Sequence, residues 1–325
     1  METRIHVAVG VIYNPDKSKV LIAKRTAKQH LAGFWEFPGG KVEQDEDIAS
    51  ALIRELDEEL GIVVKEAKQF TTVLYDYPDK KVLLDVWQVH EWSGEPKSRE
   101  NQEIAWSTIS ELNNYDFPEA NKHIIQTLSL SPIYLISQKT YKNESKLLSI
   151  VDECFSVGIR SFQLRLDFRQ EPEFSALLNR VNKLAKKYDA KLILNGTPAD
   201  IENFYVDGIH LKSKELLNYE SRPISEKYIL GASCHNEEEL VLAEKLNVNY
   251  AFISPVLRTN SHPEETAIGW DRFYKMRKKV KFPVYALGGM TPADIEIAKY
   301  YDAYGVAMIS AIWNSTKPVS GILSQ

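Results

Sequence analysis

Three glutamates in a short acidic stretch are the residues of this chain that are best placed to do chemistry. Glu55, Glu58 and Glu59 stand at positions i, i+3 and i+4, so on a helix their carboxylates would share one face. Like charges crowded in this way repel each other unless a cation binds among them. Oxygen ligands of this kind suit Mg2+, with Mn2+ as an alternative, and these ions commonly share their coordination with substrate phosphates. The competing interpretation is a solvated acidic helix face.

The glutamates belong to a longer pattern of fixed spacing, GKVEQDEDIASALIRELDEELGI, which runs from Gly40 to Ile62. Glu46 follows the first glycine after five residues, Arg54 follows after seven more, and Gly61 closes the pattern. This spacing resembles the signature of the Nudix hydrolases. The first 130 residues are also similar to the MutT subgroup of that family, through the stretches VAVG at 7–10, KR at 24–25 with the histidine at 30, EFPGGK at 36–41 and DFPEAN at 116–121.

The resemblance implies a metal site and residues that support it. By this resemblance, Glu55, Glu58 and Glu59 bind the metal, and Arg54 orients their carboxylates. The backbone of Gly39 is expected beside the metal, because a glycine lets the main chain approach closely. Glu100 falls where MutT proteins have a further carboxylate, so it is a candidate metal ligand or general base; a surface-loop role is the alternative.

The resemblance also implies a nucleotide pocket, with Arg25, His30, Phe37, Tyr77 and Asn121 at substrate-binding positions. Asn121 matches the asparagine that hydrogen-bonds oxidised guanine, and an amide offers both a donor and an acceptor. Spacing alone would instead make Asn121 a helix N-cap. Tyr77 stands where the family has phenylalanine. The implied reaction is Mg2+-dependent hydrolysis of 8-oxo-dGTP or 8-oxo-GTP to the monophosphate and pyrophosphate.

Length and composition describe an ordinary soluble chain with room for two domains. It has 325 residues, 44% of them hydrophobic and 26% charged. No apolar run reaches the length of a membrane span, and the N-terminus lacks the pattern of a signal peptide. The two cysteines, Cys154 and Cys234, have no metal-ligand spacing, so we expect a reducing cytoplasm and small buried side chains rather than reactive thiols.

Charge is shared unevenly along the chain. The formal net charge is −5, with a balance of −7 over residues 1–130 and +2 over the remainder. An acidic first domain argues against binding a nucleic acid polymer, whose affinity comes largely from Lys and Arg contacts to phosphate. It fits a metal-nucleotide site, where the metal supplies the positive charge.

The order of predicted elements changes near Pro132, where we place the boundary between a domain of residues 1–130 and one of residues 131–325. The first domain has strand patterns at 5–13, 20–23, 70–76 and 81–91, a helix at about 47–60 and another from about 121 to 128. Together with the resemblance, this implies a Nudix α/β/α sandwich with a mixed sheet.

The second domain alternates strands and helices regularly, which predicts a compact (β/α)8 TIM barrel. A doubly wound open sheet is the alternative. Expected strands lie at 133–137, 161–167, 191–195, 208–211, 229–233, 250–256, 284–288 and 305–309. Helices are expected at 145–157, 172–188, 237–246 and 270–279, and the connection at 212–227 is expected to be irregular or a short helix.

The second domain resembles the thiamine-phosphate synthase and TenI family over nearly its whole length, through QLR at 163–165, LNG at 194–196, DGIHL at 207–211, GAS at 231–233, SPV at 254–256, ALGGM at 286–290 and GVAMISA at 305–311. The last two stretches follow strands seven and eight, where such barrels often bind phosphate, although tight turns would also need these glycines. The implied site for a thiazole or thiamine phosphate comprises Arg165, Asn195, Ser233, Thr259, Gly288, Gly289, Ile309 and Ser310.

The catalytic residues of that family are largely replaced here. Asp167 stands in place of a lysine, Gly196 in place of a metal-binding aspartate, and His262 in place of another lysine, while Glu215 aligns with the second metal aspartate. The TenI branch shares Asn195-Gly196, but its catalytic histidine aligns with Pro255, which leaves His235 or His262 as substitutes. We therefore expect a TenI-like barrel that binds a phosphorylated ligand. For the first domain, the alternative is a Nudix enzyme of the thiamine pathway that hydrolyses diphosphates of thiamine or its pyrimidine precursor. For the barrel, the alternative is a catalytically inactive module that regulates or stabilises the first domain.

Overall fold

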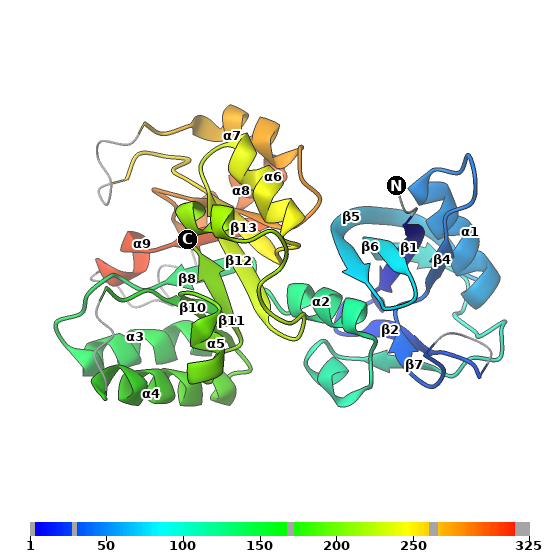
Figure 1. The fold of residues 1–325 in the computed structure, drawn as a ribbon, viewed down its shortest axis with the longest axis horizontal. Helices are drawn as coiled ribbons and strands as arrows, with labels where there is room; N and C mark the ends of the chain where they lie inside the picture. Colours follow the sequence, from blue (N-terminus) through cyan, green and yellow to red (C-terminus); the bar gives the residue numbers. More distant parts are fainter. Residues whose placement is uncertain (1–3, 28–30, 168–171, 260–265, 316–325) are drawn as a thin grey trace. The chain divides into compact units, whose positions relative to one another are not determined.

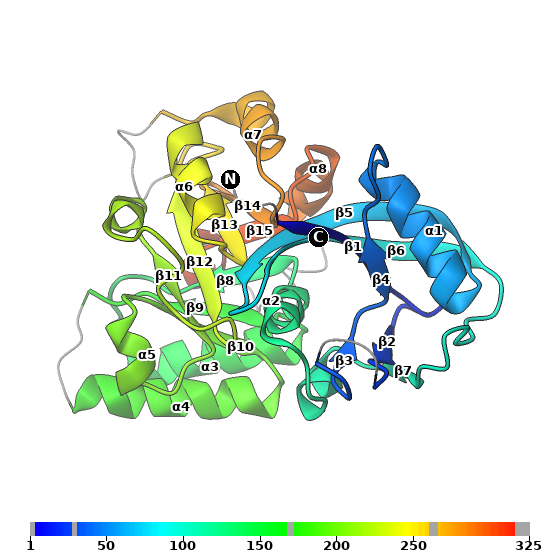
Figure 2. The ribbon, with the colours of Figure 1, turned by 45° about the vertical axis from the view of Figure 1, so that its right-hand side comes forward.

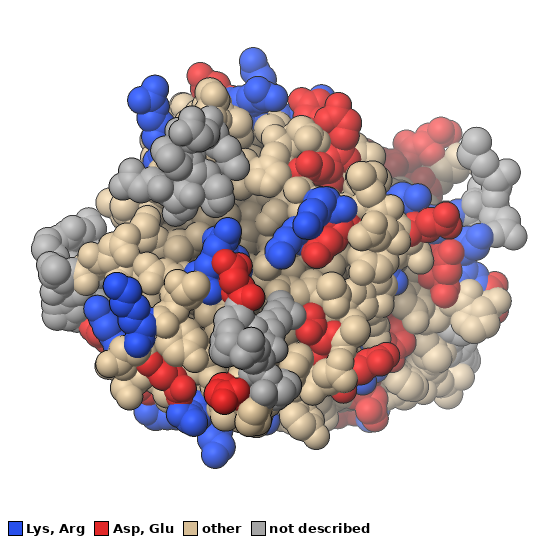
Figure 3. Space-filling view, turned by 60° about the vertical axis from the view of Figure 1, so that its left-hand side comes forward, with Lys and Arg blue, Asp and Glu red and all other residues tan. Residues whose placement is uncertain are grey.

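The computed structural model describes residues 4–27, 31–167, 172–259 and 266–315, and the chain divides into two compact units, 1–128 and 129–325. None of the helices in the described ranges is long and apolar enough to cross a membrane. On the face drawn in Figure 3, Lys and Arg side chains are interspersed with Asp and Glu side chains.

The first unit contains two sheets (Figure 1). Four strands lie in the order β4 (Gly39–Lys41), β1 (Ile5–Ile12), β6 (Lys81–Ser93) and β5 (Val63–Asp76). This sheet is mixed, because β1 runs parallel to β6 while the β1–β4 and β5–β6 pairs are antiparallel. The second sheet joins β3 (Trp35–Glu36), β2 (Val20–Lys24) and β7 (Ile104–Ser107).

Helix α1 (Ile48–Leu60) carries the three glutamates and has a clear start and end. The Asp47 carboxylate caps its N-terminus by accepting from the amides of Ala49 and Ser50, both at 3.0 Å. Gly61 ends the helix in the left-handed conformation, with φ 70°, which glycine adopts without strain. The apolar side of the helix, formed by Ala51, Leu52, Leu56 and Leu60, is buried in a core with Ala8, Ile12, Leu21, Ile62 and Val89. Because this side is buried, the polar side is left to face the site.

Helix α2 (Glu119–Leu128) lies against β5, whereas α1 lies against β1, β4 and β5. The arrangement is the predicted Nudix-type combination of helices on a mixed sheet. Asn121 is the third residue of α2 and not its N-cap, so the interpretation from spacing alone is wrong. A 3-10 helix, η1 (Ser110–Asn114), precedes α2.

Two features of the first unit differ from the sequence patterns. β5 begins at Val63, seven residues before the expected start, because register shifts between 64 and 71 interrupt the alternation of buried and exposed side chains. Strands β3, β4 and β7 were not expected, since two to four residues are too few to show a period.

The second unit is a closed barrel of eight parallel strands, so the doubly wound alternative is excluded. β15 pairs with β8 and closes the ring. Every predicted strand is present, and several end one to three residues earlier than expected, because the last residues turn into the loops at the barrel mouth. The strands are β8 (Ile133–Ile136), β9 (Ser161–Leu164), β10 (Lys191–Asn195), β11 (Gly208–Leu211), β12 (Ile229–Cys234), β13 (Tyr250–Ile253), β14 (Val284–Leu287) and β15 (Gly305–Met308).

Helices cover the outside of this barrel (Figure 2). They are α3 (Glu144–Ser156), α4 (Glu173–Lys187), α5 (Ala199–Asn203), α6 (Glu237–Lys245), α7 (Gly269–Arg277), α8 (Ile295–Tyr300) and α9 (Ser310–Trp313), with 3-10 helices η2 (Ser213–Asn218) and η3 (Pro292–Asp294). The segment 212–227, expected to be irregular or a short helix, contains only η2. A cluster of large side chains, including Tyr134, Tyr250, Phe252 and Tyr285, fills the core formed by the strands.

Both cysteines are fully buried, as predicted for small apolar side chains. Burial raises the pKa of the Cys154 thiol to about 12 and holds that of Cys234 well above its ordinary value. Neither therefore has the character of a reactive thiolate at neutral pH.

Candidate functional site

Arg54 is the centre of a hydrogen-bond network on the polar side of α1. Its Nε and Nη2 atoms donate to the two carboxylate oxygens of Glu46 at 2.9 and 2.8 Å. Nη1 donates to Glu55 at 2.8 Å and to Glu58 at 3.3 Å, and Nη2 also reaches the carbonyl oxygen of Lys41 at 3.0 Å. One guanidinium group thus fixes two of the three glutamates and ties α1 to the strand β4.

The glycines of β4 let the carboxylates approach the main chain. Gly39 has φ 144°, and a Cβ there would lie 2.1 Å from the carbonyl oxygen of Ala8. Its amide donates to the Glu59 carboxylate at 3.0 Å. A Cβ on Gly40 would lie 2.1 Å from the Glu55 carboxyl carbon. Larger residues at these two positions would therefore displace the strand or the glutamates.

Glu59 is the most buried of the three glutamates, with 8% of its surface exposed, whereas the Glu58 side chain is 59% exposed. Burial raises the pKa of Glu59 to about 8, and the charges of Glu36, Glu100 and Glu55 add to this effect. The Gly39 amide opposes it but does not outweigh it. Glu59 is thus a buried carboxylate that no Arg or Lys of the described residues neutralises.

Glu36 and Glu100 complete the acidic site. Glu36 accepts hydrogen bonds from Arg25 at 2.7 Å, yet burial outweighs this cation and raises the pKa of Glu36. Glu100 is exposed and contributes to the raised pKa values of Glu36, Glu55 and Glu59. The segment before Glu100 is anchored on the end of α1, because the Arg99 amide donates to the Glu59 carbonyl at 2.8 Å.

The donor set has the chemistry of a site for a hard divalent cation: several carboxylates, one of them buried without a cationic partner among the described residues. In the described ranges, no three His, Cys, Asp or Glu side chains already surround one metal position. Arg54 occupies oxygens of Glu55 and Glu58 instead. The residues fit a metal in kind, because Arg54 contacts only one oxygen of each of these two carboxylates and leaves the other oxygen of each available to a cation.

Four of the five residues assigned to the nucleotide pocket lie in the described ranges, and His30 lies outside them. The Asn121 side chain, 6% exposed, accepts a hydrogen bond from the Phe37 amide at 3.4 Å. The Phe37 ring is buried and stacks on Phe117 with a centroid distance of 5.7 Å. Tyr77 is partly buried, and its hydroxyl forms a hydrogen bond with the backbone of Ala120, the neighbour of Asn121 in sequence.

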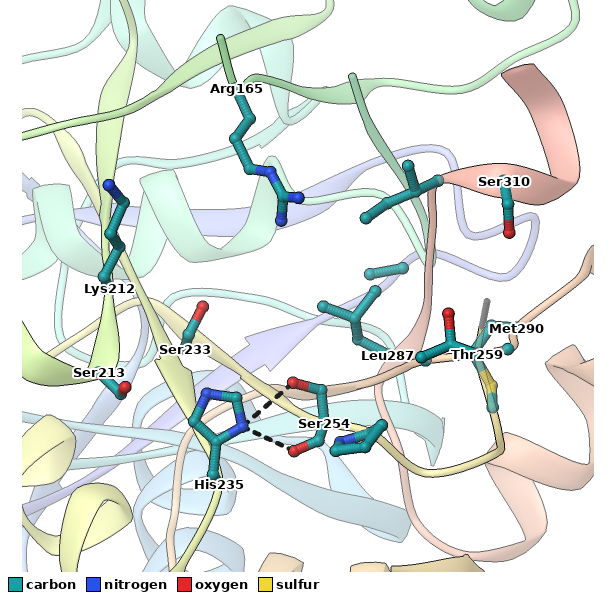
Figure 4. A pocket seen from close by; sticks show the side chains of 15 residues that line it. Arg165, Lys212, Ser213, Ser233, His235, Ser254, Thr259, Leu287, Met290 and Ser310 are labelled. Carbon is teal, nitrogen blue, oxygen red and sulfur yellow. Dashed lines mark hydrogen bonds between the residues drawn. The ribbon is translucent and has the colours of Figure 1, made fainter. Parts of the chain in front are cut away.

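In the second unit, two adjoining cavities open at the carboxyl ends of the barrel strands. Their volumes are about 220 and about 450 Å³. Arg165, Lys212, Ser233 and Leu287 line both cavities, so the two form one divided pocket, which we call the barrel pocket. Figure 4 shows the Arg165 guanidinium and the Ser233 hydroxyl directed toward the middle of the first cavity.

All eight barrel residues predicted to bind a ligand line this pocket. Seven line the smaller cavity and Asn195 lines the larger one; the seven are Arg165, Ser233, Thr259, Gly288, Gly289, Ile309 and Ser310. Gly288 and Gly289 have φ 98° and 71°, and a Cβ on either would lie 2.8 Å or less from a neighbouring atom. These glycines are therefore needed for the turn itself, and that turn forms part of the pocket wall.

Lys212 lines both cavities and was not expected from the sequence, nor was Lys139 at the larger cavity. Lys212 follows β11 directly, at the carboxyl end of a barrel strand, which is the position where barrels place functional side chains. Its position directly after a predicted strand could therefore have identified Lys212 as a pocket residue from the sequence. Its side chain, Arg165 and Lys139 bring three cations to a pocket from which the lysines of the family motif are missing.

The positions that depart from the family motif also lie at the pocket. Asp167 and Glu215 line the larger cavity, but the Glu215 carboxylate accepts from the Lys212 amide at 2.9 Å. Pro255 and His235 line the smaller cavity, where His235 Nδ1 donates to the Ser254 carbonyl at 2.8 Å, as Figure 4 shows. His262 lies outside the described residues.

Comparisons with known proteins match the two units separately. The family described as NUDIX domain matches residues 8–127, and the family described as Thiamine monophosphate synthase matches residues 133–312. An 8-oxo-dGTP diphosphatase of Escherichia coli (strain K12) is 39% identical over 125 residues, which are 38% of this chain and 96% of that protein.

A protein of Aquifex aeolicus (strain VF5) named putative thiamine-phosphate synthase 2 is 32% identical over 183 residues, which are 56% of this chain and 98% of that protein. The structure of a thiamine phosphate pyrophosphorylase from Pyrococcus furiosus covers 61% of this chain and 94% of its own, with 23% identity and a TM-score of 0.51. This last likeness concerns the barrel fold alone.

Glu59 should make the stability of the metal-free protein depend on pH. Its pKa is raised from 4.5 to about 8 in the folded state, so the folded chain holds a proton that the unfolded chain releases. The free energy of unfolding should therefore fall as pH rises between these two values, and Glu59→Gln should flatten the decline. Urea unfolding in a chelator at a series of pH values measures this.

Glu58→Gln is the matched control, because it makes the same chemical change on the same helix at a largely exposed side chain. It should keep most of the decline. An unchanged decline in Glu59→Gln would contradict the electrostatic account of the site.

Proposed function

Because the chain belongs to the Nudix family in its first unit and to the thiamine monophosphate synthase family in its second, we propose that it is an Mg2+-dependent nucleotide hydrolase joined to a ligand-binding barrel. Its proposed substrates are 8-oxo-dGTP and 8-oxo-GTP, cleaved to the monophosphate and pyrophosphate. The Escherichia coli relative named 8-oxo-dGTP diphosphatase supports this choice, since it aligns over 96% of its own length.

The observation that carries the hydrolase proposal is the crowding of glutamates around the β4 glycines. Glu55, Glu58 and Glu59 would hold Mg2+, or Mn2+ in its place, with Gly39 and Glu100 beside them. A bound metal of this kind polarises a phosphoryl oxygen, activates a water molecule and neutralises the leaving group. Arg54 positions the Glu55 and Glu58 carboxylates before the metal arrives and takes up part of their charge.

The remaining carboxylates can accept the proton of the attacking water. Glu100 is exposed and belongs to the same electrostatic cluster as Glu55 and Glu59, so it is the proposed general base. Arg25 is held by Glu36 at 2.7 Å, and we propose that it contacts the phosphates of the nucleotide. The β4 glycines leave room for the phosphates to approach the main chain.

Base recognition is proposed for Asn121. Its side-chain oxygen is occupied by the Phe37 amide, so its amide nitrogen is the atom that can donate to the base. The Tyr77 hydroxyl, beside Ala120 at the start of the same helix, adds a second polar group near the base. A base that left these buried groups unpaired would bind less well, by about 1–3 kcal/mol for each unpaired group.

Glu58→Gln should lower turnover of 8-oxo-dGTP by about 100-fold while the protein remains folded. The substitution removes one carboxylate charge without changing the shape of the side chain, and the side chain is 59% exposed. Pyrophosphate release with Mg2+ measures the effect. Glu111→Gln, an exposed glutamate on η1 in the same unit, serves as the control and should retain full turnover.

Asn121→Ala should reduce the preference for 8-oxo-dGTP over dGTP by about tenfold, because one hydrogen bond to the base is lost. Hydrolysis of dGTP should change little, since the metal site is intact. The ratio of kcat/KM for the two nucleotides measures this. Full selectivity in the variant would show that another group reads the base.

For the second unit, we propose that the barrel pocket binds a small phosphorylated ligand, such as a thiazole phosphate or a thiamine phosphate. Arg165 and Lys212 supply positive charge to both cavities. The buried Nε of Arg165 has no hydrogen-bond partner among the described residues, and the side chain lines both cavities. Since Asp167 takes the place of a motif lysine and Gly196 that of a metal-binding aspartate, the proposed role is binding, without catalysis of thiamine-phosphate synthesis.

Lys212→Met should weaken binding of a thiazole phosphate to the full-length protein by about tenfold, because it removes one charge-assisted hydrogen bond. Isothermal titration in a chelator restricts the measurement to metal-independent binding. Lys214→Met, two residues along on η2 and not among the residues lining the pocket, is the matched control. Absence of binding to the unmodified protein would refute the ligand-binding proposal and leave a structural or regulatory role.

A further inference from the structure

Four hydrogen-bonded side chains run from the sealed interior of the barrel to the barrel pocket. The hydroxyls of Tyr134 and Tyr250 are 2.6 Å apart, and the Tyr250 hydroxyl is 3.0 Å from Nδ1 of His210. Nε2 of His210 is 2.8 Å from the Ser233 hydroxyl. The first three residues are fully buried, whereas Ser233 lines both cavities of the pocket. We call this set the tyrosine–histidine chain.

His210 is neutral at physiological pH. Burial lowers its pKa to about 3, and the nearby charge of Arg165 acts in the same direction. Its ring lies among aromatic side chains, with Phe252 stacked at 4.5 Å and Tyr250 at 5.6 Å between ring centroids. A neutral imidazole carries one N–H, so one ring nitrogen donates and the other accepts.

The number of hydrogens in the chain decides its direction. Each of the four groups carries one polar hydrogen, and the three contacts between them use one hydrogen each. One hydrogen is therefore not used within the chain, and the group that carries it must donate it to an acceptor outside the chain. The identity of this group determines whether Ser233 presents a donor or only an acceptor to the pocket.

Among the described residues, the barrel interior offers no acceptor for this remaining hydrogen. No described residue other than Tyr250 accepts a hydrogen bond from Tyr134, and none outside the chain accepts one from Tyr250. The Tyr134 ring is enclosed by Phe252 and Tyr285, and the Tyr285 hydroxyl is committed to the Ser131 carbonyl at 2.7 Å. A buried donor without an acceptor is strongly disfavoured. The remaining possibility is that Ser233, at the pocket end of the chain, donates this hydrogen.

We propose that the tyrosine–histidine chain holds Ser233 as a hydrogen-bond donor that selects an anionic oxygen of the ligand. Tyr134 donates to Tyr250, Tyr250 donates to His210 Nδ1, and His210 Nε2–H donates to Ser233. The Ser233 O–H is then directed into the pocket. The inference rests on the proposed binding of an anionic ligand there and names the group that this ligand must present: a phosphate or carboxylate oxygen.

The smaller cavity agrees with this direction, because the described residues that line it include no Asp or Glu, whereas Asp167 and Glu215 line only the larger cavity. Arg165 and Lys212, which line both cavities together with Ser233, can only donate. The opposite direction would make Ser233 an acceptor and favour an amino group beside two cations. Because Arg165 and Lys212 would repel an ammonium group in the smaller cavity, they favour the donor state of Ser233.

The tautomer of His210 tests the direction of the chain without any ligand. In full-length protein labelled with 15N-histidine, long-range proton–nitrogen NMR spectra distinguish a protonated ring nitrogen from an unprotonated one. His210 is one of seven histidines. Its signals are those that move in Tyr250→Phe and stay in place in Tyr285→Phe, which removes a buried hydroxyl outside the chain.

The expected result is a protonated Nε2 and an unprotonated Nδ1, unchanged between about pH 5 and about pH 8, because the residue does not titrate there. A protonated Nδ1, or two protonated nitrogens at neutral pH, would overturn the proposal.

Titration with inorganic phosphate and with acetate tests recognition of the anion and separates its two sources. The His210 Nε2 proton is the site-specific readout, and a chelator removes any metal from the first unit. Phosphate or acetate should shift this proton, and Ser233→Ala should weaken the binding by about tenfold. Equal affinity in Ser233→Ala would refute the role of Ser233. If neither anion binds although the tautomer is as expected, the proposed barrel ligand is wrong and the direction of the chain stands.

Discussion

The structure of the first unit depends on how it accommodates buried negative charge next to β4. Glu36, Glu55, Glu59 and Glu100 influence one another, and only part of their charge is balanced. Arg54 is bound to Glu46, Glu55 and Glu58, and Arg25 is bound to Glu36. Glu59 receives a single backbone N–H from Gly39. Without a metal, Glu59 is neutralised by a proton, and the proposed Mg2+ would replace that proton.

The rest of the first unit keeps these groups in place. The apolar side of α1 is fixed in the core by Leu52, Leu56 and Leu60, so its polar side cannot rotate away from β4. The β4 glycines remove the side chains that would separate strand and glutamates. The two proposed sites differ in charge: the first gathers carboxylates next to β4, while the second brings Arg165 and Lys212 directly to its pocket.

Much of this arrangement could be predicted from sequence where the signal is local. The spacing of the glutamates determines which face of α1 they share, and the alternation of short apolar strands and helices predicts a barrel. Features that arise from tertiary contacts could not be predicted in this way. β5 starts early because of bulges, and Asn121 lies inside α2 instead of capping it. The tyrosine–histidine chain joins β8, β13, β11 and β12, and no pattern in sequence indicates that their side chains meet.

The most direct test of the central claim is the substrate preference of the full-length protein with Mg2+. The quantity to measure is kcat/KM for 8-oxo-dGTP, dGTP and thiamine diphosphate, from release of pyrophosphate or phosphate. The account predicts a strong preference for 8-oxo-dGTP, release of pyrophosphate, and loss of activity when the metal is chelated. Little activity on 8-oxo-dGTP, together with release of phosphate from thiamine diphosphate, would contradict it and assign the acidic site to the chemistry of the barrel's own family.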